Sequence, residues 1–262
     1  MTASVLLIAI VAMIFLMSPL LFAVTVALFF MVAAYEWAGL FGATVSQVYR
    51  WLFVILTVLG LYFCYLLPLL PLLILALAIW IWSVIALFGY QKKGWSIGFE
   101  YSFAKIIAGL IILVCCWRSI TFLQANLPVC LLLVFCLCWL MDTGAFFTGR
   151  MWGKDSLASR ISPKKTWQGF WGGMILSVMI IAIASLLLPL SFWQHLLIIP
   201  VILLCSGFAV VGDLFVSLLK RQVGVKDTGT ILPGHGGLLD RVDSTLSTVP
   251  IFTLGYLLIH GQ

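Results

Sequence analysis

Three aspartates in the last quarter of the chain have the residue type and spacing of a metal site. Asp240 and Asp243 are three residues apart, so on a helix their carboxylates share one face. Asp213 interrupts an uncharged run from Leu196 to Leu219, where a carboxylate without compensation is costly in a membrane. Converging carboxylates beside basic residues suit Mg²⁺ when phosphate oxygens complete its shell. We therefore predict that Asp213, Asp240 and Asp243 gather around a divalent cation.

Serine and lysine side chains near these aspartates predict ligands for phosphate groups. If a helix continues past Asp213, Ser217 and Lys220 lie on the same face at i+4 and i+7. The segment that begins Ser162-Pro163 and contains Lys165 is typical of a helix N-terminus, where free backbone N–H groups and lysines bind anions. The other candidates for substrate contacts are Asp142, Lys154, Arg221, Lys226, His235 and Arg241.

Structural interpretations of the same residues are also open. Asp213 could pair with a lysine for stability alone, and the pair that begins at Asp240 could cap the last helix. The outermost cations, Lys164 and Arg221, could simply mark the cytoplasmic side of a membrane. His235, which lies between glycines, could pack a turn rather than contact phosphate.

The elements that must position these residues are apolar spans. Of the 262 residues, 64% are hydrophobic and 8% are charged, whereas a soluble globular chain has roughly 25% charged residues. This composition excludes a soluble domain and a disordered chain, and the net charge of +6 is expected to face anionic lipid headgroups rather than a nucleic acid. We predict an all-α, polytopic integral membrane bundle of about nine transmembrane helices with a cytoplasm-facing polar cavity. The expected spans are 4–17, 20–35, 51–67, 69–88, 103–120, 128–142, 169–189, 194–214 and 244–260.

Nine spans distribute the charged residues unevenly between the two sides of a membrane. All Lys and Arg residues except Arg118 fall on one side together with every acid, which is the positive-inside pattern. We therefore expect the N-terminus and the chemistry on the cytoplasmic side. Six of the eight acids follow position 140, so residues 1–125 are expected to be a transmembrane scaffold and residues 126–262 the catalytic region. The seven cysteines lie in apolar runs and are expected to be free thiols.

One long segment resembles the signature of phosphatidate cytidylyltransferases (CDP-diacylglycerol synthases). Within residues 213–243 it reads Ser217-Leu-Leu-Lys220-Arg221-x4-Lys226-Asp227-x-Gly229-x2-Leu232-Pro233-x-His235-Gly236-Gly237-x2-Asp240-Arg241-x-Asp243. The segments that begin at Asp142, Ser162 and Gly212 resemble three further parts of this family, and before residue 140 only Tyr35-Glu36-Trp37 does. Val216 departs from the pattern, because family members often have Glu at this position.

The resemblance implies that CTP and phosphatidate are converted to CDP-diacylglycerol and pyrophosphate. It also implies Mg²⁺ dependence, with a second cation as an open alternative, a location in a bacterial inner membrane, contact with membrane lipids, and a homodimer. By position, Asp213 and Asp240 would hold the metal and Asp243 would assist. The residues that would clamp phosphates are Lys165, Lys220, Lys226 and Arg241, with Ser162 and Ser217 as polar ligands.

Three other functions stay open on the sequence alone. An ion or solute transporter also carries acids inside the membrane, although it would spread them over several spans instead of clustering them. A CDP-alcohol phosphatidyltransferase would need a compact Asp-Gly…Ala-Arg…Gly…Asp…Asp pattern, which the sequence lacks. A non-catalytic relative could use the same cavity to bind lipid, and Val216 is compatible with that function.

Overall fold

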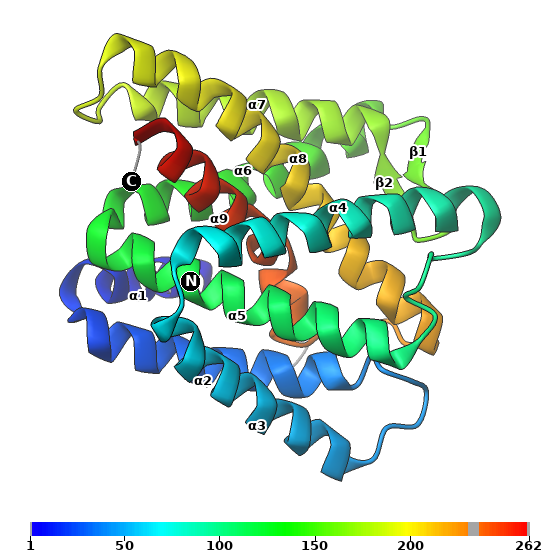
Figure 1. Ribbon diagram of the computed structural model, residues 1–262. Coiled ribbons are helices and arrows are strands. Elements are labelled where there is room, and N and C mark those ends of the chain that lie inside the picture. The colour runs from blue at the N-terminus through cyan, green and yellow to red at the C-terminus, as the bar shows by residue number, and fades with distance from the viewer. Residues whose placement is uncertain (1, 230–235, 261–262) are drawn as a thin grey trace.

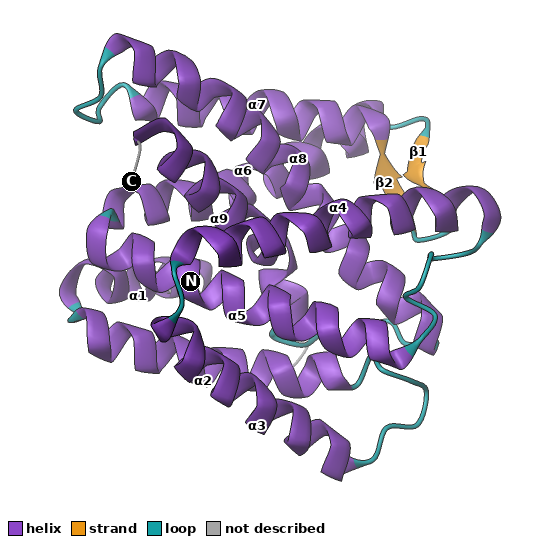
Figure 2. Ribbon diagram, in the orientation of Figure 1, coloured by secondary structure: helices purple, strands orange, loops and turns teal. Residues whose placement is uncertain are grey.

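The computed structural model describes residues 2–229 and 236–260. Helices dominate this part of the chain, and two short antiparallel strands form a hairpin at one end (Figure 1 and Figure 2). The strands are β1 (Ser156–Ala158) and β2 (Ser162–Thr166). The helices are α1 (Thr2–Leu16), α2 (Pro19–Ala38), α3 (Gln47–Phe63), α4 (Leu69–Lys93), α5 (Ser102–Asn126), α6 (Pro128–Trp152), α7 (Trp167–Ser185), α8 (Phe192–Val223) and α9 (Leu239–His260), with a 3₁₀ turn at Cys64–Leu66.

Most of these helices have the length and composition of membrane spans. A bilayer core takes roughly 20 apolar residues per helix. Among the described residues, the eight helices from α2 to α9 meet this requirement, and α1 adds the shorter apolar stretch Leu7–Leu16. α5 and α9 are the most enclosed, with 67% and 61% of their apolar stretches buried inside the bundle. The prediction of an all-α polytopic membrane bundle is therefore confirmed.

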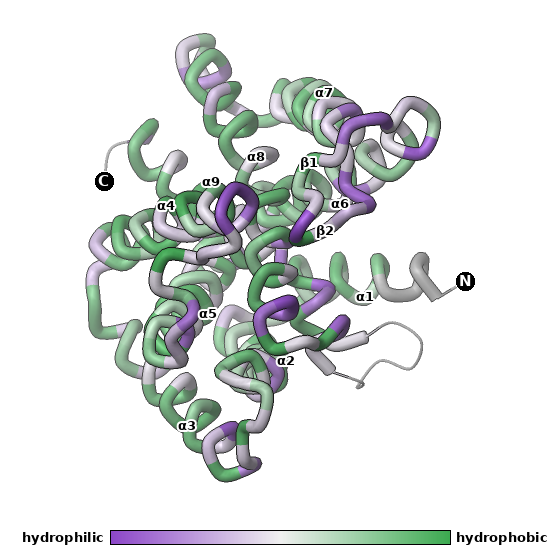
Figure 3. Tube along the Cα trace, turned by 90° about the vertical axis from the view of Figure 1, so that its right-hand side faces the viewer, coloured by the Kyte–Doolittle hydropathy of each residue, from purple (hydrophilic) through white to green (hydrophobic). Residues whose placement is uncertain are grey.

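The charged segments lie together at one end of the bundle. The connections from α2 to α3, α4 to α5, α6 to α7 and α8 to α9 all lie at this end (Figure 1). Figure 3 views the molecule from this end and shows hydrophilic segments gathered in these connections. Every basic residue that the charge count assigns to one side lies in or beside these loops. The side of the membrane that this end faces stays a prediction.

Three helices continue past the charged residues at which the sequence patterns end them. α2 runs past Glu36 to Ala38, α6 runs past Asp142 to Trp152, and α8 runs past Asp213 to Val223. The hydrogen bonds of a helix join backbone groups and do not require apolar side chains. Each of these carboxylates also has a polar or charged neighbour on another element, as described below. The expected ends of the spans 20–35, 128–142 and 194–214 were therefore too early.

The expected helix start at Ser162 was wrong. Ser162 begins strand β2, which pairs with β1 in the register Ser156 to Thr166 and Ala158 to Ser162. The helix that follows starts at Trp167, and its N-cap is Thr166, whose hydroxyl accepts a hydrogen bond from the backbone N–H of Gly169 at 3.1 Å. Serine before proline suits an extended strand as well as a helix cap, because both residues favour extended backbone there. Hairpin pairing selects the strand.

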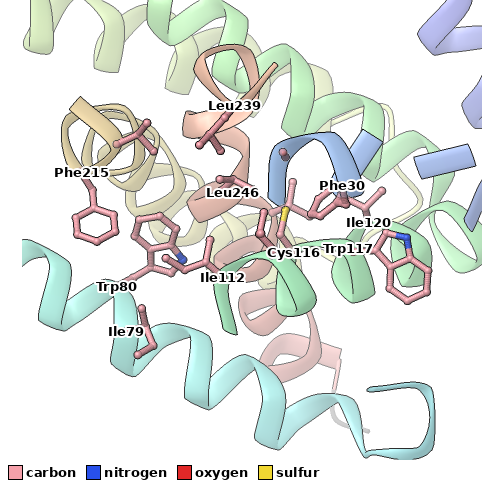
Figure 4. Packing of buried hydrophobic residues seen from close by; sticks show 14 of the residues in the cluster. Phe30, Ile79, Trp80, Ile112, Cys116, Trp117, Ile120, Phe215, Leu239 and Leu246 are labelled. Atoms are coloured by element: carbon pink, nitrogen blue, oxygen red, sulfur yellow. The ribbon is translucent and has the colours of Figure 1, made fainter. Parts of the chain in front are cut away.

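An aromatic cluster fixes the orientation of α8. The ring of Phe215 lies 4.8 Å from Phe99, 5.9 Å from Trp80 and 6.3 Å from Trp37, centroid to centroid. Figure 4 shows Phe215 in this core, together with Trp80 of α4 and Leu239 of α9. Val216 is also completely buried in the apolar core. The buried face of α8 leaves the side chains of Asp213, Ser217 and Lys220, spaced as the sequence predicts, partly exposed on a different face.

Gly212 allows α8 and α9 to cross at very short distance. A Cβ atom at Gly212 would lie 2.3 Å from the carbonyl oxygen of Asp243 and 2.6 Å from Oγ of Ser247. The hydroxyl of Ser247 in turn donates to the carbonyl oxygen of Phe208 at 2.6 Å. The crossing places Asp213, the next residue of α8, beside Asp243 of α9.

We expect Gly212→Ala to destabilise the protein, although alanine favours a helix over glycine by roughly 1 kcal/mol. The added methyl group meets backbone that cannot move without separating the helices, and overpacking of this kind costs about 1–3 kcal/mol. The matched control is Gly207→Ala on the same helix, where the nearest atom to an added Cβ is the flexible Cε of Met174 at 3.9 Å. Thermal unfolding in detergent should show a lower midpoint for the first variant only. Equal midpoints would contradict the crossing.

Candidate active site

Two lysine–aspartate ion pairs lie on the polar face of α8. Nζ of Lys165, in β2, pairs with Oδ2 of Asp213. Two turns further along α8, Nζ of Lys220 lies 2.6 Å from Oδ1 of Asp240 at the start of α9. The side chains of the first pair are 28% and 27% exposed, whereas those of the second are 12% and 10% exposed. The more accessible pair is therefore Lys165–Asp213.

Two further carboxylates lie near the first ion pair. Asp142 of α6 and Asp243 of α9 both interact electrostatically with Asp213 and with Lys165. Asp142 is exposed, whereas Asp243 is 8% exposed and accepts a hydrogen bond from the backbone N–H of Ser244 at 2.8 Å. We call Asp142, Lys165, Asp213 and Asp243 the Asp213 centre. Four separate elements, α6, β2, α8 and α9, supply its side chains.

The charges of the Asp213 centre suit a cation. Three carboxylates and one ammonium group leave an excess of negative charge, which is unfavourable where water is scarce. Lys165 compensates part of it, and Oγ of Ser217 lies 3.4 Å from Oδ1 of Asp213 as a weaker donor. An exposed carboxylate such as Asp142 within a membrane-spanning helix also requires water or a counter-ion. The centre therefore has the oxygen ligands and the charge that Mg²⁺ requires.

The carboxylates do not form a complete metal site by themselves. The described residues contain no group of three or more His, Cys, Asp or Glu side chains arranged to hold an ion. Mg²⁺ usually takes one or two carboxylates and completes its shell with water and substrate phosphates. The residues thus fit a metal that binds together with a phosphorylated substrate.

Asp240 is held by a separate set of donors. Besides Lys220, it accepts hydrogen bonds at Oδ2 from the backbone N–H of Thr228 at 2.9 Å, from the Thr228 hydroxyl at 3.0 Å and from the N–H of Gly237 at 3.1 Å. We call Lys220, Thr228, Gly237 and Asp240 the Asp240 centre. Asp213 and Lys220 are seven residues apart on α8, so their Cα atoms are about 10 Å apart along its axis.

The structure thus separates the three aspartates into two neighbouring groups. Asp213 and Asp243 belong to one centre, whereas Asp240 has its hydrogen bonds and ion pair in the other. Asp213 does pair with a lysine, but this lysine is Lys165 of β2, whereas Lys220 on the same face of α8 pairs with Asp240. The sequence predicts the correct face of α8 but not these partners.

The other sequence candidates lie around these centres. Arg221 donates from Nε to the carbonyl oxygen of Ile161 at 3.1 Å, so it ties α8 to the β-hairpin. The backbone N–H of Lys154 donates to Oε1 of Gln168 at 3.1 Å. Lys226 and Arg241 are exposed, and Ser162 is partly buried in β2. His235 lies outside the described residues.

Glu36 is a functional candidate that the sequence analysis left out of its site. This residue of α2 is 2% exposed, and its carboxylate accepts hydrogen bonds from the first residues of α9 and from Thr228. The signal that could have identified it is the one that identified Asp213, an acid inside an apolar span. The sequence analysis assigned the front half of the chain to scaffold and therefore gave Glu36 no role.

Comparisons with known proteins agree with this arrangement. The chain is similar to proteins named phosphatidate cytidylyltransferase from Staphylococcus epidermidis, at 44% identity over 124 residues, and from Haemophilus influenzae, at 39% over 137 residues. These alignments cover 47% and 49% of this chain, and the chain spans about half the length of these two relatives (47% and 46%). A protein of the same name from Pseudomonas aeruginosa is 34% identical over 184 residues, which are 69% of this chain and 66% of the relative.

A match at the level of the family covers more of the chain. Residues 1–259 match the cytidylyltransferase family, including the apolar first half in which few residues suggest a function. The four residues of the two lysine–aspartate pairs all lie within this range. The protein therefore belongs to the cytidylyltransferase family.

Proposed function

We propose that this protein is a phosphatidate cytidylyltransferase, which converts CTP and phosphatidate to CDP-diacylglycerol and pyrophosphate. The observation that carries the proposal is the polar face of α8, where two lysine–aspartate pairs meet β2 and the start of α9 inside an apolar bundle. Family membership and the names of the relatives support the same reaction.

The proposed reaction is a transfer between phosphates, and it needs little from the protein beyond position and charge. An oxygen of the phosphatidate phosphate attacks the α-phosphorus of CTP, and the bond from this phosphorus to the bridging oxygen of the β-phosphate breaks. The electron pair leaves with pyrophosphate. Because the attacking phosphate is already an anion, no general base is required. Lys165 and Lys220 would bind phosphate oxygens in exchange for their aspartate partners.

Mg²⁺ would neutralise the triphosphate and favour the departure of pyrophosphate. The electrostatic contacts support Asp213 and Asp243 as its protein ligands, with Asp142 available for a second cation. Asp240 would stay in the Asp240 centre, held by Thr228 and Gly237, and Lys220 beside it would bind a phosphate group. The remaining candidates, Ser162, Ser217, Lys226, Arg241 and His235, would contact the substrates from the loops and from α8.

The position of the site in the membrane fits a lipid substrate. Asp142 and Asp213 lie inside membrane-spanning helices, each ten residues from the polar end of its helix. Phosphatidate would enter sideways from the bilayer, and its phosphate would reach a hydrated cavity open to the cytoplasm while its acyl chains stay in lipid. A cytoplasmic N-terminus in an inner membrane and a homodimer are part of this proposal.

The proposal can be tested with purified protein in detergent. CTP, phosphatidate and Mg²⁺ should give CDP-diacylglycerol, detected by mass spectrometry of the lipid extract. EDTA should abolish the product, and added Mg²⁺ should restore it. A transporter would show solute flux in liposomes without product, and a non-catalytic lipid-binding relative would bind phosphatidate without turnover. Either result would reject the proposed activity.

A further inference from the structure

We propose that Glu36 is a positioning residue for the cytidylyltransferase reaction, which holds the start of α9 so that Asp240 faces Lys220. This inference rests on the proposed function. Glu36 belongs to α2, more than 190 residues away in sequence from the groups that it binds. Its hydrogen bonds go to Thr228, Leu238 and Leu239, so it would act through these residues.

The carboxylate of Glu36 occupies the position at the N-terminus of α9 where helices commonly bind anions. Its Oε1 accepts the backbone N–H of Leu238 at 3.1 Å, and its Oε2 accepts the N–H of Leu239 at 2.7 Å. The first N–H groups of a helix have no partner within the helix and carry partial positive charge, so they favour an anion. Glu36 therefore fills a position that a phosphate could otherwise take. Substrate phosphates are left to the lysines of the two centres.

Thr228 connects Glu36 to Asp240. Its hydroxyl lies 3.2 Å from Oε2 of Glu36 and 3.0 Å from Oδ2 of Asp240, so the two carboxylates share one donor. Gly237 gives a second connection, because its N–H donates to Asp240 while its Cα lies against Glu36. Any displacement of the Glu36 carboxylate would therefore move Thr228 and Gly237, which supply three of the four donor groups around Asp240.

Two glycines fit closely around the same carboxylate. A Cβ atom at Gly229 would lie 2.4 Å from Oε1 of Glu36, and one at Gly237 would lie 2.6 Å from Oε2. Both distances are far below van der Waals contact. Gly229 and Gly237 can thus lie this close to Glu36 only because neither has a side chain, so the backbone at both positions is fitted to this carboxylate.

The test compares Glu36→Gln with Trp37→Phe, its neighbour on α2. Glutamine keeps one acceptor but turns an NH₂ group toward a backbone N–H, whereas Trp37 donates to the carbonyl oxygen of Lys105 of α5 at 3.0 Å. We expect Glu36→Gln to lower kcat roughly 10- to 100-fold, the loss of one or two hydrogen bonds to a charged group, with KM for CTP and phosphatidate little changed. Trp37→Phe should leave kcat within about threefold, a change under 1 kcal/mol.

Hydrogen exchange gives a readout that does not depend on turnover. Peptides from 236–246 should exchange faster in Glu36→Gln, and peptides from α5 should not change. Wild-type protein in the same preparation separates the two hypotheses: if it is inactive, the proposed function fails. If wild type is active and Glu36→Gln keeps its kcat, or loses no more than Trp37→Phe does, the role of Glu36 is rejected.

A second pair of variants covers the case in which Glu36→Gln does not fold. Gly229→Ala pushes the carboxylate away without removing it, and Gly42→Ala is its control because an added Cβ there meets only Val45 at 4.0 Å. We expect Gly229→Ala to lower kcat about tenfold or more and Gly42→Ala to keep it. Full activity of Gly229→Ala in folded protein would overturn the inference.

Discussion

Asp213→Asn is expected to lower kcat by about 10²- to 10³-fold while the protein still folds, which is the usual effect of removing one charge-stabilising group from a catalytic site. The side chain keeps its shape but loses the charge that holds Lys165 and that would bind Mg²⁺. Because Asp213 is 27% exposed, the loss of its ion pair should cost little stability. Product formation at saturating CTP measures the effect.

The control for this variant is another acid at the polar end of the bundle. Asp155 is exposed, and its Oδ2 accepts a hydrogen bond from Nε2 of Gln168 at 3.1 Å, outside both centres. Asp155→Asn should keep kcat within about twofold, less than 0.5 kcal/mol. If Asp213→Asn were as active as Asp155→Asn at the same level of folded protein, the Asp213 centre would not be catalytic.

Asp240→Asn is expected to abolish turnover and also to destabilise the protein. Lys220 and Asp240 are about 90% buried, and removing one partner of a buried pair costs about 3–5 kcal/mol because the other charge stays without compensation. The double variant Asp240→Asn with Lys220→Met removes both charges and should regain most of the stability. Thermal unfolding and kcat are measured for both variants.

The double variant distinguishes a catalytic pair from a structural one. If the Asp240 centre serves catalysis, the stability returns and the activity does not. If Asp240 only caps α9 and pairs with Lys220 for stability, the activity should return together with the melting temperature. The second result would contradict the mechanism, although it would leave the fold unchanged.

The sequence predicts the existence of the spans better than their ends. Long apolar runs must form helices in lipid, because each backbone polar group needs a partner inside its own segment. A charged residue inside an apolar run makes the predicted helix end too early when the group that compensates its charge is distant in sequence. The hydrogen bonds to Glu36 of α2 from Leu239, the first residue of α9, and from Leu238 before it are such cases, and so is the pair of Asp213 with Lys165. Local patterns cannot reveal them.

The same limit applies to the site. Spacing at i, i+4 and i+7 correctly places Asp213, Ser217 and Lys220 on one face of α8. The spacing does not identify the partners of these residues: Asp213 pairs with Lys165 of β2, and Lys220 pairs with Asp240 of α9. Tertiary contacts decide the partners, because Asp213 and Lys220 are two helical turns apart, whereas β2 and α9 each bring an oppositely charged group closer than that. Gly212 and Gly229 also lie where other groups approach the backbone closely, but the sequence does not identify these groups as Asp243 and Glu36.

The fate of the α-phosphate of CTP tests the central claim most directly. Purified protein with phosphatidate and Mg²⁺ would receive CTP labelled at either the α- or the γ-phosphate. We expect the α label to enter the extracted lipid in an amount equal to the γ label recovered as pyrophosphate, and Asp213→Asn to slow both by about 10²- to 10³-fold. Release of γ label as inorganic phosphate, with the α label still in water-soluble nucleotide and phosphatidate unchanged, would contradict it.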